Sequence, residues 1–105
     1  MTEAWLMADR LGFSRYFAVS FDTVPVDPEA TPHAKQTLLR LCQRSRSRDI
    51  REEVVHGQAH PGPLFVEHLT EFASRYWDVS AAAQSCPSLQ RAITALHALP
   101  KAGQR

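Results

Sequence analysis

Residues 63–79, PLFVEHLTEFASRYWDV, carry the strongest pattern in the chain. Placed on a helix at about 100° per residue, the apolar side chains of this stretch fall within one arc of about 140°. The members of that arc are Phe65, Val66, Leu69, Phe72, Ala73, Tyr76 and Trp77, and four of these seven are aromatic. The pattern predicts an amphipathic helix opened by Pro63, whose large apolar face is covered by the core or by a partner.

Length and composition place this helix in a small globular protein. The chain has 105 residues, 44% of them hydrophobic, and a formal net charge of +1. These values favour one domain with a modest core and argue against bulk attraction to nucleic acid or membranes. No apolar run approaches about 18 residues, and no signal-peptide pattern opens the chain. We therefore expect a cytoplasmic protein whose two cysteines, Cys42 and Cys86, are reduced.

The segment from Phe13 to Val24 has two interpretations. Phe17, Val19 and Phe21 alternate with polar or small residues, which is the period of a strand. Phe13, Phe17 and Phe21 also recur every four residues, which is the period of a helix. The strand is favoured because Tyr, Phe and Val dominate and Val24 precedes a proline. A lone strand would pair with a second copy, so we expect a homodimer.

Proline and glycine divide the rest of the chain into helices. These are expected at residues 3–11, 32–56, 63–79 and 87–99, with a proline-rich connector before residue 32, a loop at 57–63 and a frayed tail at 100–105. Thr31 is expected to cap the second helix, and Gly57 to end it. That helix either bends near Ser45 to Ser47 or gives way to another beginning at Asp49. The fold class is mostly α: one small bundle of four to five helices, residues 31–99 forming its core, with the strand as an optional N-terminal addition.

The aromatic helix is also the candidate partner surface. Leu38, Leu41, Leu89, Ile93 and Leu96 lie on neighbouring apolar stripes and are expected to cover part of its face. Val66 and Trp77 lie at one edge of the arc and are expected to emerge from the core. Because Trp and Tyr are frequent in binding hot spots, the candidate partner-binding residues are Phe65, Val66, Leu69, Phe72, Tyr76 and Trp77.

A second candidate surface is basic. Arg40, Arg44, Arg48 and Arg51 would form one stripe if residues 32–56 were a continuous helix. Such a stripe could meet phosphates or an acidic protein face. The alternative is a solvated face with Arg48 and Glu52 paired at i, i+4, which the near-zero net charge favours.

Residues 69–85, LTEFASRYWDVSAAAQS, resemble the layout of a helix-turn-helix, with an alanine inside the first helix and Val-Ser opening the second. The turn lacks the usual glycine, and residues 80–85 contain no Arg, Lys or Asn to contact bases or phosphates. DNA binding is therefore the alternative function, and a nucleic-acid partner is not the favoured one.

The chain contains no motif for catalysis, a cofactor or a metal ion. His56 and His60 are four residues apart near His68, but no CxxC or HExxH spacing occurs, and His56 is expected to complement a helix dipole instead. Cys42 lies on an apolar stripe, whereas Cys86 precedes a helix, where a thiolate is favoured. Glu67 and Glu71 share a polar helix face, as solvated carboxylates do. We expect a non-catalytic protein.

In size, helical layout and lack of chemical motifs, the chain resembles the small bacterial antiactivators of quorum sensing of the QslA type. The helix PLFVEHLTEFASRYW, residues 63–77, is the candidate binding face. The resemblance implies a stoichiometric regulator that binds a LuxR-type transcription factor and blocks its dimerisation, using the six candidate partner-binding residues of the aromatic helix.

Overall fold

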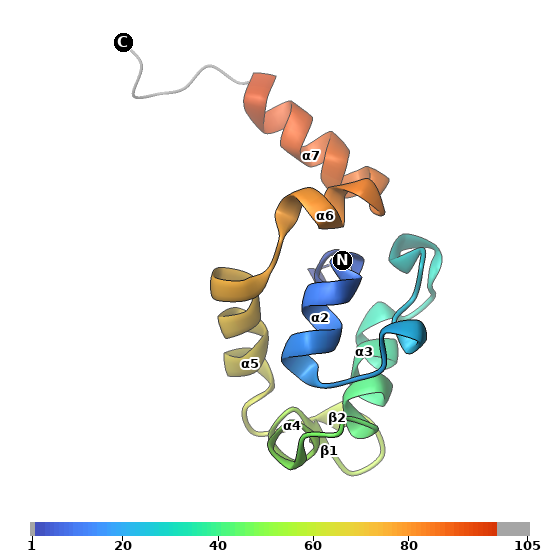
Figure 1. Ribbon diagram of the computed structural model, residues 1–105, viewed down its shortest axis with the longest axis vertical. Helices are drawn as coiled ribbons and strands as arrows, with labels where there is room; N and C mark the ends of the chain where they lie inside the picture. Colours follow the sequence, from blue (N-terminus) through green and yellow to red (C-terminus); the bar gives the residue numbers. More distant parts are fainter. Residues whose placement is uncertain (1, 99–105) are drawn as a thin grey trace.

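The computed structural model describes residues 2–98, and its regular elements are almost all helical. The α-helices are α1 (Thr2–Ala8), α2 (Arg10–Phe17), α3 (Ala34–Gln43), α4 (Arg48–Glu53), α5 (Phe65–Glu71), α6 (Val79–Gln84) and α7 (Pro87–Ala98). Figure 1 shows α2, α3, α4 and α5 gathered into one body, while α6 and α7 lead away from one end of it. The mostly α prediction is confirmed, with more and shorter helices than expected.

The first predicted helix is broken at Asp9. The Asp9 side chain caps α2 by accepting a hydrogen bond from the Gly12 amide at 3.1 Å. Gly12 therefore lies inside α2 and does not end a helix. A Cβ at Gly12 would meet the Asp9 carboxylate at 2.2 Å, so the cap depends on glycine at this position. Residues 3–11 thus contain two helices joined at a buried carboxylate.

The predicted N-terminal strand is wrong. Phe13 and Phe17 lie in α2, fully buried, with ring centroids 4.5 Å apart. Both rings also contact Phe72, at 6.0 and 5.5 Å. The four-residue period prevails because it places both rings on the helix face that meets this third aromatic side chain. The chain leaves α2 through Ala18, which has a positive φ of 54°, and then forms the 3-10 helix η1 (Phe21–Thr23). The homodimer argument that depended on an unpaired strand is lost with it.

The connector and α3 begin differently from the prediction. A 3-10 helix, η2 (Pro28–Ala30), lies inside the proline-rich connector. Thr31 does not cap α3, because its hydroxyl donates to the carbonyl of Asp27 at 3.1 Å. The residue before α3 is His33, with a positive φ of 56°. A separate helix then begins after Ser47, whose side chain accepts from the Ile50 amide, so the interpretation with two helices in residues 32–56 is confirmed.

The predicted loop at 57–63 contains half of a small hairpin. Strands β1 (Val55–His56) and β2 (His60–Pro61) pair antiparallel, with Val55 opposite Pro61. Gly57 belongs to the turn between them, at φ 60°, and does not end a helix, because α4 stops at Glu53. The turn residues Gly57 and Ala59 both take positive φ, which closes the hairpin within three residues.

The buried side chains form two clusters. The larger one joins α1, α2, α3, α4 and the aromatic stretch around Phe13, Leu38 and Phe72. The smaller one joins α1, α6 and α7 around Ala82, Cys86 and Leu89. The expected burial of Leu38 is confirmed and Leu41 is partly buried, but Leu96 is 65% exposed and lies outside the core. Leu99 and the predicted tail at 100–105 fall outside the described residues.

Candidate functional site

The predicted aromatic surface is divided by a π-helix. After α5 the chain continues as η3 (Phe72–Tyr76), a π-helix, whose wider turn rotates the later side chains away from the face they would take in an α-helix. As a result Phe72 is fully buried while Tyr76 is 55% exposed, although four residues separate them. Phe65 is buried too, so Phe65 and Phe72 lie in the core and not on the exposed surface that the pattern predicted for them.

The other predicted contact residues do not form one patch. Leu69 and Trp77 are partly buried against the core. Val66 is 66% exposed and borders a hollow shared with charged and hydroxyl side chains such as Glu67 and Ser74. Tyr76 borders a different hollow beside Tyr16. The six residues are therefore divided between the core and two separate surfaces.

Trp77 connects the body to α6 and α7. Its indole packs against both buried clusters, and its Nε1 donates to the Trp5 carbonyl at 3.0 Å. The next residue, Asp78, donates its amide to Asp9 Oδ2 at 2.9 Å and caps α6 with its own carboxylate. The direction in which α6 leaves the body is thus fixed by one indole and two carboxylates.

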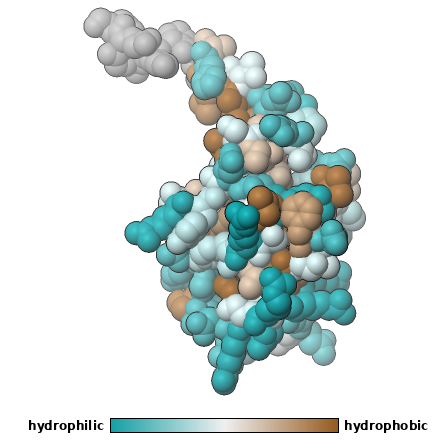
Figure 2. Space-filling view, viewed as in Figure 1, coloured by the Kyte–Doolittle hydropathy of each residue, from teal (hydrophilic) through white to brown (hydrophobic). Residues whose placement is uncertain are grey.

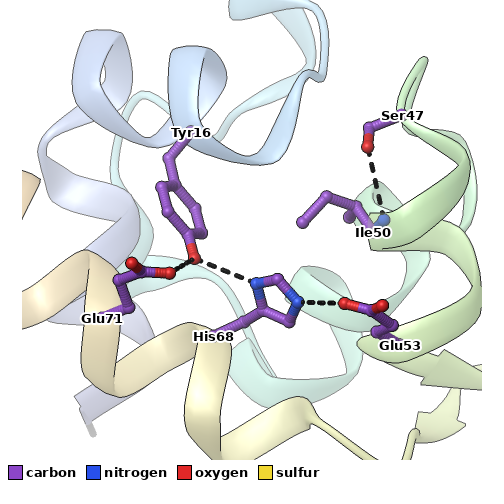
Figure 3. A network of polar contacts seen from close by, with 6 residues as sticks. All are labelled: Tyr16, Ser47, Ile50, Glu53, His68 and Glu71. Carbon is purple, nitrogen blue, oxygen red and sulfur yellow. Dashed lines mark hydrogen bonds and ion pairs between the residues drawn. The ribbon is translucent and has the colours of Figure 1, made fainter.

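A polar network joins α2, α4 and α5 (Figure 3). His68 Nε2 lies 2.7 Å from Glu53 Oε1, and His68 Nδ1 lies 2.9 Å from the Tyr16 hydroxyl. The same hydroxyl donates to Glu71 Oε1 at 2.9 Å. His68 and Glu71 stand at i, i+3 on α5, a spacing visible in the sequence, but their partners Tyr16 and Glu53 are distant in the chain. Sequence reasoning considered His68 only beside His56 and His60 and missed this network.

The network holds α2, α4 and α5 together through side-chain contacts. Tyr16 has one hydroxyl hydrogen, so all three contacts are hydrogen bonds only when His68 carries a proton on both ring nitrogens. Burial, and then the Glu71 carboxylate, raise the pKa of Tyr16. A raised pKa opposes the phenolate, the form that would attack a substrate. The Glu-His-Tyr series therefore contains a phenol that burial and Glu71 keep protonated.

Both cysteines are free, buried thiols. Burial raises the pKa of the Cys42 thiol to about 12, as expected for a core thiol. Burial also raises the pKa of Cys86, so the expectation of a favoured thiolate there is wrong. His56 lies in β1 opposite His60, two residues beyond the C-cap Val54 of α4, so it is not in the last turn of that helix. Within residues 2–98 no group of three or more His, Cys, Asp or Glu side chains could hold a metal ion.

The four predicted basic residues do not form one stripe, because α3 and α4 are separate helices. Arg48 pairs with Glu52 at 2.8 Å, as the i, i+4 interpretation predicts. Arg51 donates to the Ser45 carbonyl at 2.6 Å. Arg40 and Arg44 instead border a groove beside α3. The continuous basic face is therefore wrong, and its two halves have different surroundings.

An apolar groove between α6 and α7 was not predicted. We call it the arm groove; it encloses about 620 Å³ and its apolar lining residues are Val79, Ala83, Ile93 and Leu96. Ser, Gln, Thr and His complete the lining, and no Asp, Glu, Lys or Arg is among the described residues that border it. In Figure 2, brown hydrophobic side chains lie among white and teal ones over the upper part of the molecule, where Figure 1 places α7. Sequence reasoning missed the groove because the periodicity of α7 does not reveal which element its apolar stripe faces.

The helix-turn-helix interpretation gains no geometric support. Its second helix, α6, has six residues and contains neither Arg nor Lys. Asp78 opens that helix with a negative charge, where a recognition helix commonly meets phosphates.

Comparison with protein-family models, curated proteins and solved structures finds no match to the chain. Among the described residues, no helix has the length and apolar character needed to cross a lipid bilayer. The candidate site is accordingly defined by geometry alone, as the arm groove.

Proposed function

We propose that this chain is a non-catalytic regulatory protein of the cytoplasm that binds another protein through the arm groove. The observation that carries this proposal is the apolar stripe of α7. Leu89 anchors the first turn in the smaller core cluster, while Ile93 is half-buried and Leu96 is 65% exposed. The apolar stripe of α7 therefore extends beyond the residues that are buried against the rest of the protein.

The free energy of burying apolar surface favours a partner bound in the arm groove over an uncovered α7. A helix of 12 residues is marginally stable in water when little packs against it. Burying an exposed Leu or Val side chain contributes about 1.5–3 kcal/mol. Leu96 is 65% exposed and Val79 41% exposed, so covering both would stabilise a complex by about 2–3 kcal/mol on the same scale.

The lining of the arm groove indicates the chemistry of the partner. Without Asp, Glu, Lys or Arg at its border, the groove offers no ion pair to a charged partner surface. It matches an apolar, uncharged helical segment, the kind of surface that is most common in homodimer interfaces. A protein that covers such a surface would compete with the partner's own dimerisation.

This mode of action agrees with the resemblance to quorum-sensing antiactivators. We propose a LuxR-type transcription factor as the partner, with its dimer surface as the target. The surface used here differs from the one that the sequence favoured: the arm groove replaces the aromatic face of α5. A second copy of the chain is the other occupant that the groove could take, and affinity capture separates the two.

Affinity capture of the full-length chain from nuclease-treated lysate, read by quantitative mass spectrometry, tests the proposal. The variant Leu96→Glu places a charge in the arm groove. Val26→Glu is the matched control, because Val26 is 72% exposed and lies in the connector. We expect one dominant protein near equal stoichiometry, reduced at least tenfold by Leu96→Glu and unchanged by Val26→Glu, which corresponds to about 1.4 kcal/mol or more.

The captured protein is then purified and titrated with the wild-type chain. If it is a dimeric transcription factor, sedimentation velocity should show its dimer replaced by a heterodimer, with release of its DNA. Equal capture by both variants would contradict the arm groove as the binding surface. Capture of the chain by itself alone, with a wild-type dimer that Leu96→Glu dissociates, would assign the groove to self-association and contradict the regulatory proposal.

A further inference from the structure

A second groove, separate from the arm groove, lies beside α3 and is lined by three arginines. It encloses about 640 Å³ between the C-terminal half of α3 and the segment 19–23, and its principal polar lining residues are Ser20, Thr23, Thr37, Arg40, Arg44 and Arg46. We call it the arginine groove. Arg46 was not among the predicted basic residues, because it lies off the stripe that the other four would form; in the structure it follows the end of α3.

No carboxylate is among the described residues that border the arginine groove, although Asp22 lies in the same 19–23 segment. Arg48 and Arg75 have carboxylate partners, while Arg10 and Arg51 donate to backbone carbonyls. Within residues 2–98, the side chains of the three groove arginines make neither ion pairs nor hydrogen bonds, and no Asp or Glu borders the groove. Three positive charges thus share one hollow in a chain whose formal net charge is +1.

The walls of the arginine groove are fastened to each other. The buried Ser45 hydroxyl donates to the Phe17 carbonyl at 2.5 Å, and the Arg46 amide donates to the Ala18 carbonyl at 2.8 Å. Ala18, at φ 54°, turns the chain from α2 into the 19–23 wall. Because these contacts join the backbone of the two walls, the spacing of the walls is set by the fold before any ligand arrives, which lowers the cost of binding.

A helix-dipole role explains part of this charge. Arg40 and Arg44 are near the C-terminus of α3, where cations are favourable. Arg46 lies beyond the helix yet borders the same groove, and the Ser20 and Thr37 hydroxyls add hydrogen-bonding groups that a dipole does not require. Guanidinium groups bind phosphate in a bidentate manner, and hydroxyls complete such sites.

We propose that the arginine groove binds a small phosphorylated molecule with at least two negative charges. Its phosphate oxygens would contact Arg40, Arg44 and Arg46, and its apolar or ring portion would lie against Val19 and Leu41, which also border the groove. The volume falls in the range of small-molecule sites. A single hollow with three arginines suits one compact polyanion better than the extended phosphate array of a duplex.

Isothermal titration calorimetry on the full-length chain tests this site with pyrophosphate and ADP as probes, at low salt. We expect both to bind with one-to-one stoichiometry and adenosine to give no binding. The double variant Arg40→Gln/Arg44→Gln should weaken ADP at least tenfold. The matched control Arg48→Gln/Arg91→Gln removes the same charge outside the groove and should change affinity less than twofold. Circular dichroism confirms that each variant is folded.

Three results would overturn this inference. Failure of both pyrophosphate and ADP to bind the wild-type chain at millimolar concentration would show that the arginine groove is not a phosphate site. Equal weakening by the two double variants would show only general attraction to positive charge. A short DNA duplex that displaces ADP and binds more tightly, with the same dependence on Arg40 and Arg44, would assign the groove to nucleic acid instead. None of these results bears on the arm groove, so the two proposals stand or fall separately.

Discussion

Replacement of Trp77 by alanine should destabilise the fold strongly, although sequence periodicity placed this side chain at a partner surface. The indole packs against both buried clusters and donates to the Trp5 carbonyl at 3.0 Å. Removing a core Trp costs about 3–5 kcal/mol. Trp77 is only partly buried, which favours the lower end, and the lost hydrogen bond adds about 1 kcal/mol. We expect a loss of about 3–4 kcal/mol in the free energy of unfolding.

Urea unfolding followed by far-ultraviolet circular dichroism measures this loss. The control is Tyr76→Ala, which removes the preceding aromatic ring, 55% exposed and 5.4 Å from Tyr16. Its loss should be about 1 kcal/mol, the usual worth of an aromatic pair. If Trp77→Ala costs no more than Tyr76→Ala, the indole does not join the two clusters and the account of how α6 is held to the body is wrong.

The described contacts predict three further outcomes. Tyr16→Phe should lower the free energy of unfolding by about 1–2 kcal/mol, because it removes the hydroxyl that meets both His68 and Glu71; urea titration measures this, and an unchanged midpoint would contradict it. Burial raises the pKa of folded Cys42 to about 12, against 9.0 for a free thiol, so above pH 9 the unfolded chain loses a proton that the folded chain keeps. The free energy of unfolding should therefore fall by about 1.4 kcal/mol per pH unit up to the folded pKa. Measured from pH 8 to 11, Tm should fall less steeply in Cys42→Ala than in the wild type, and parallel slopes would refute this. Gly62→Ala should lower Tm, because the new Cβ would lie 2.7 Å from the Glu53 carbonyl oxygen and destabilise the fold by about 1–3 kcal/mol. A Tm equal to that of the wild type would show that the backbone of the hairpin moves to accept the methyl group.

Local periodicity predicted those elements whose ends are set by neighbouring residues. Pro87 opens α7 as expected. The apolar stripe of α3 places Leu38 and Cys42 in the core, where both are fully buried. The break between α3 and α4 was one of two alternatives, and the Ser47 cap decides it. Proline, serine caps and apolar spacing act over a few residues, so the sequence reports them directly.

The errors arise where distant residues decide the local structure. Asp9 breaks the first helix because its carboxylate binds both Gly12 and the amide of Asp78, 69 residues away. His68 is partly buried because Tyr16 and Glu53 meet it from other helices. No spacing along the chain contains these contacts, and tertiary packing overrides local preference at each of them.

The predicted partner surface was also misplaced because tertiary structure, and not local spacing, decides which side chains are exposed. An ideal helix places Phe72 and Tyr76 on one face, but the π-helix puts one in the core and the other at the surface. The exposed stripe on α7 has the same pattern as a buried stripe would have, since periodicity identifies an apolar face without identifying its cover. Leu96 could therefore be assigned to the arm groove only from the arrangement of α6 and α7.

Hydrogen–deuterium exchange of the α7 amides, in the free chain and with the captured partner, tests the central claim most directly. In the free protein the part of α7 beyond Leu89 has little cover, so its amides should exchange rapidly. Binding in the arm groove predicts strong protection of residues 90–98, together with α6, while the hairpin at 55–61 is unchanged. Protection confined to α5 or the arginine groove, with α7 exchanging as in the free chain, would contradict the account.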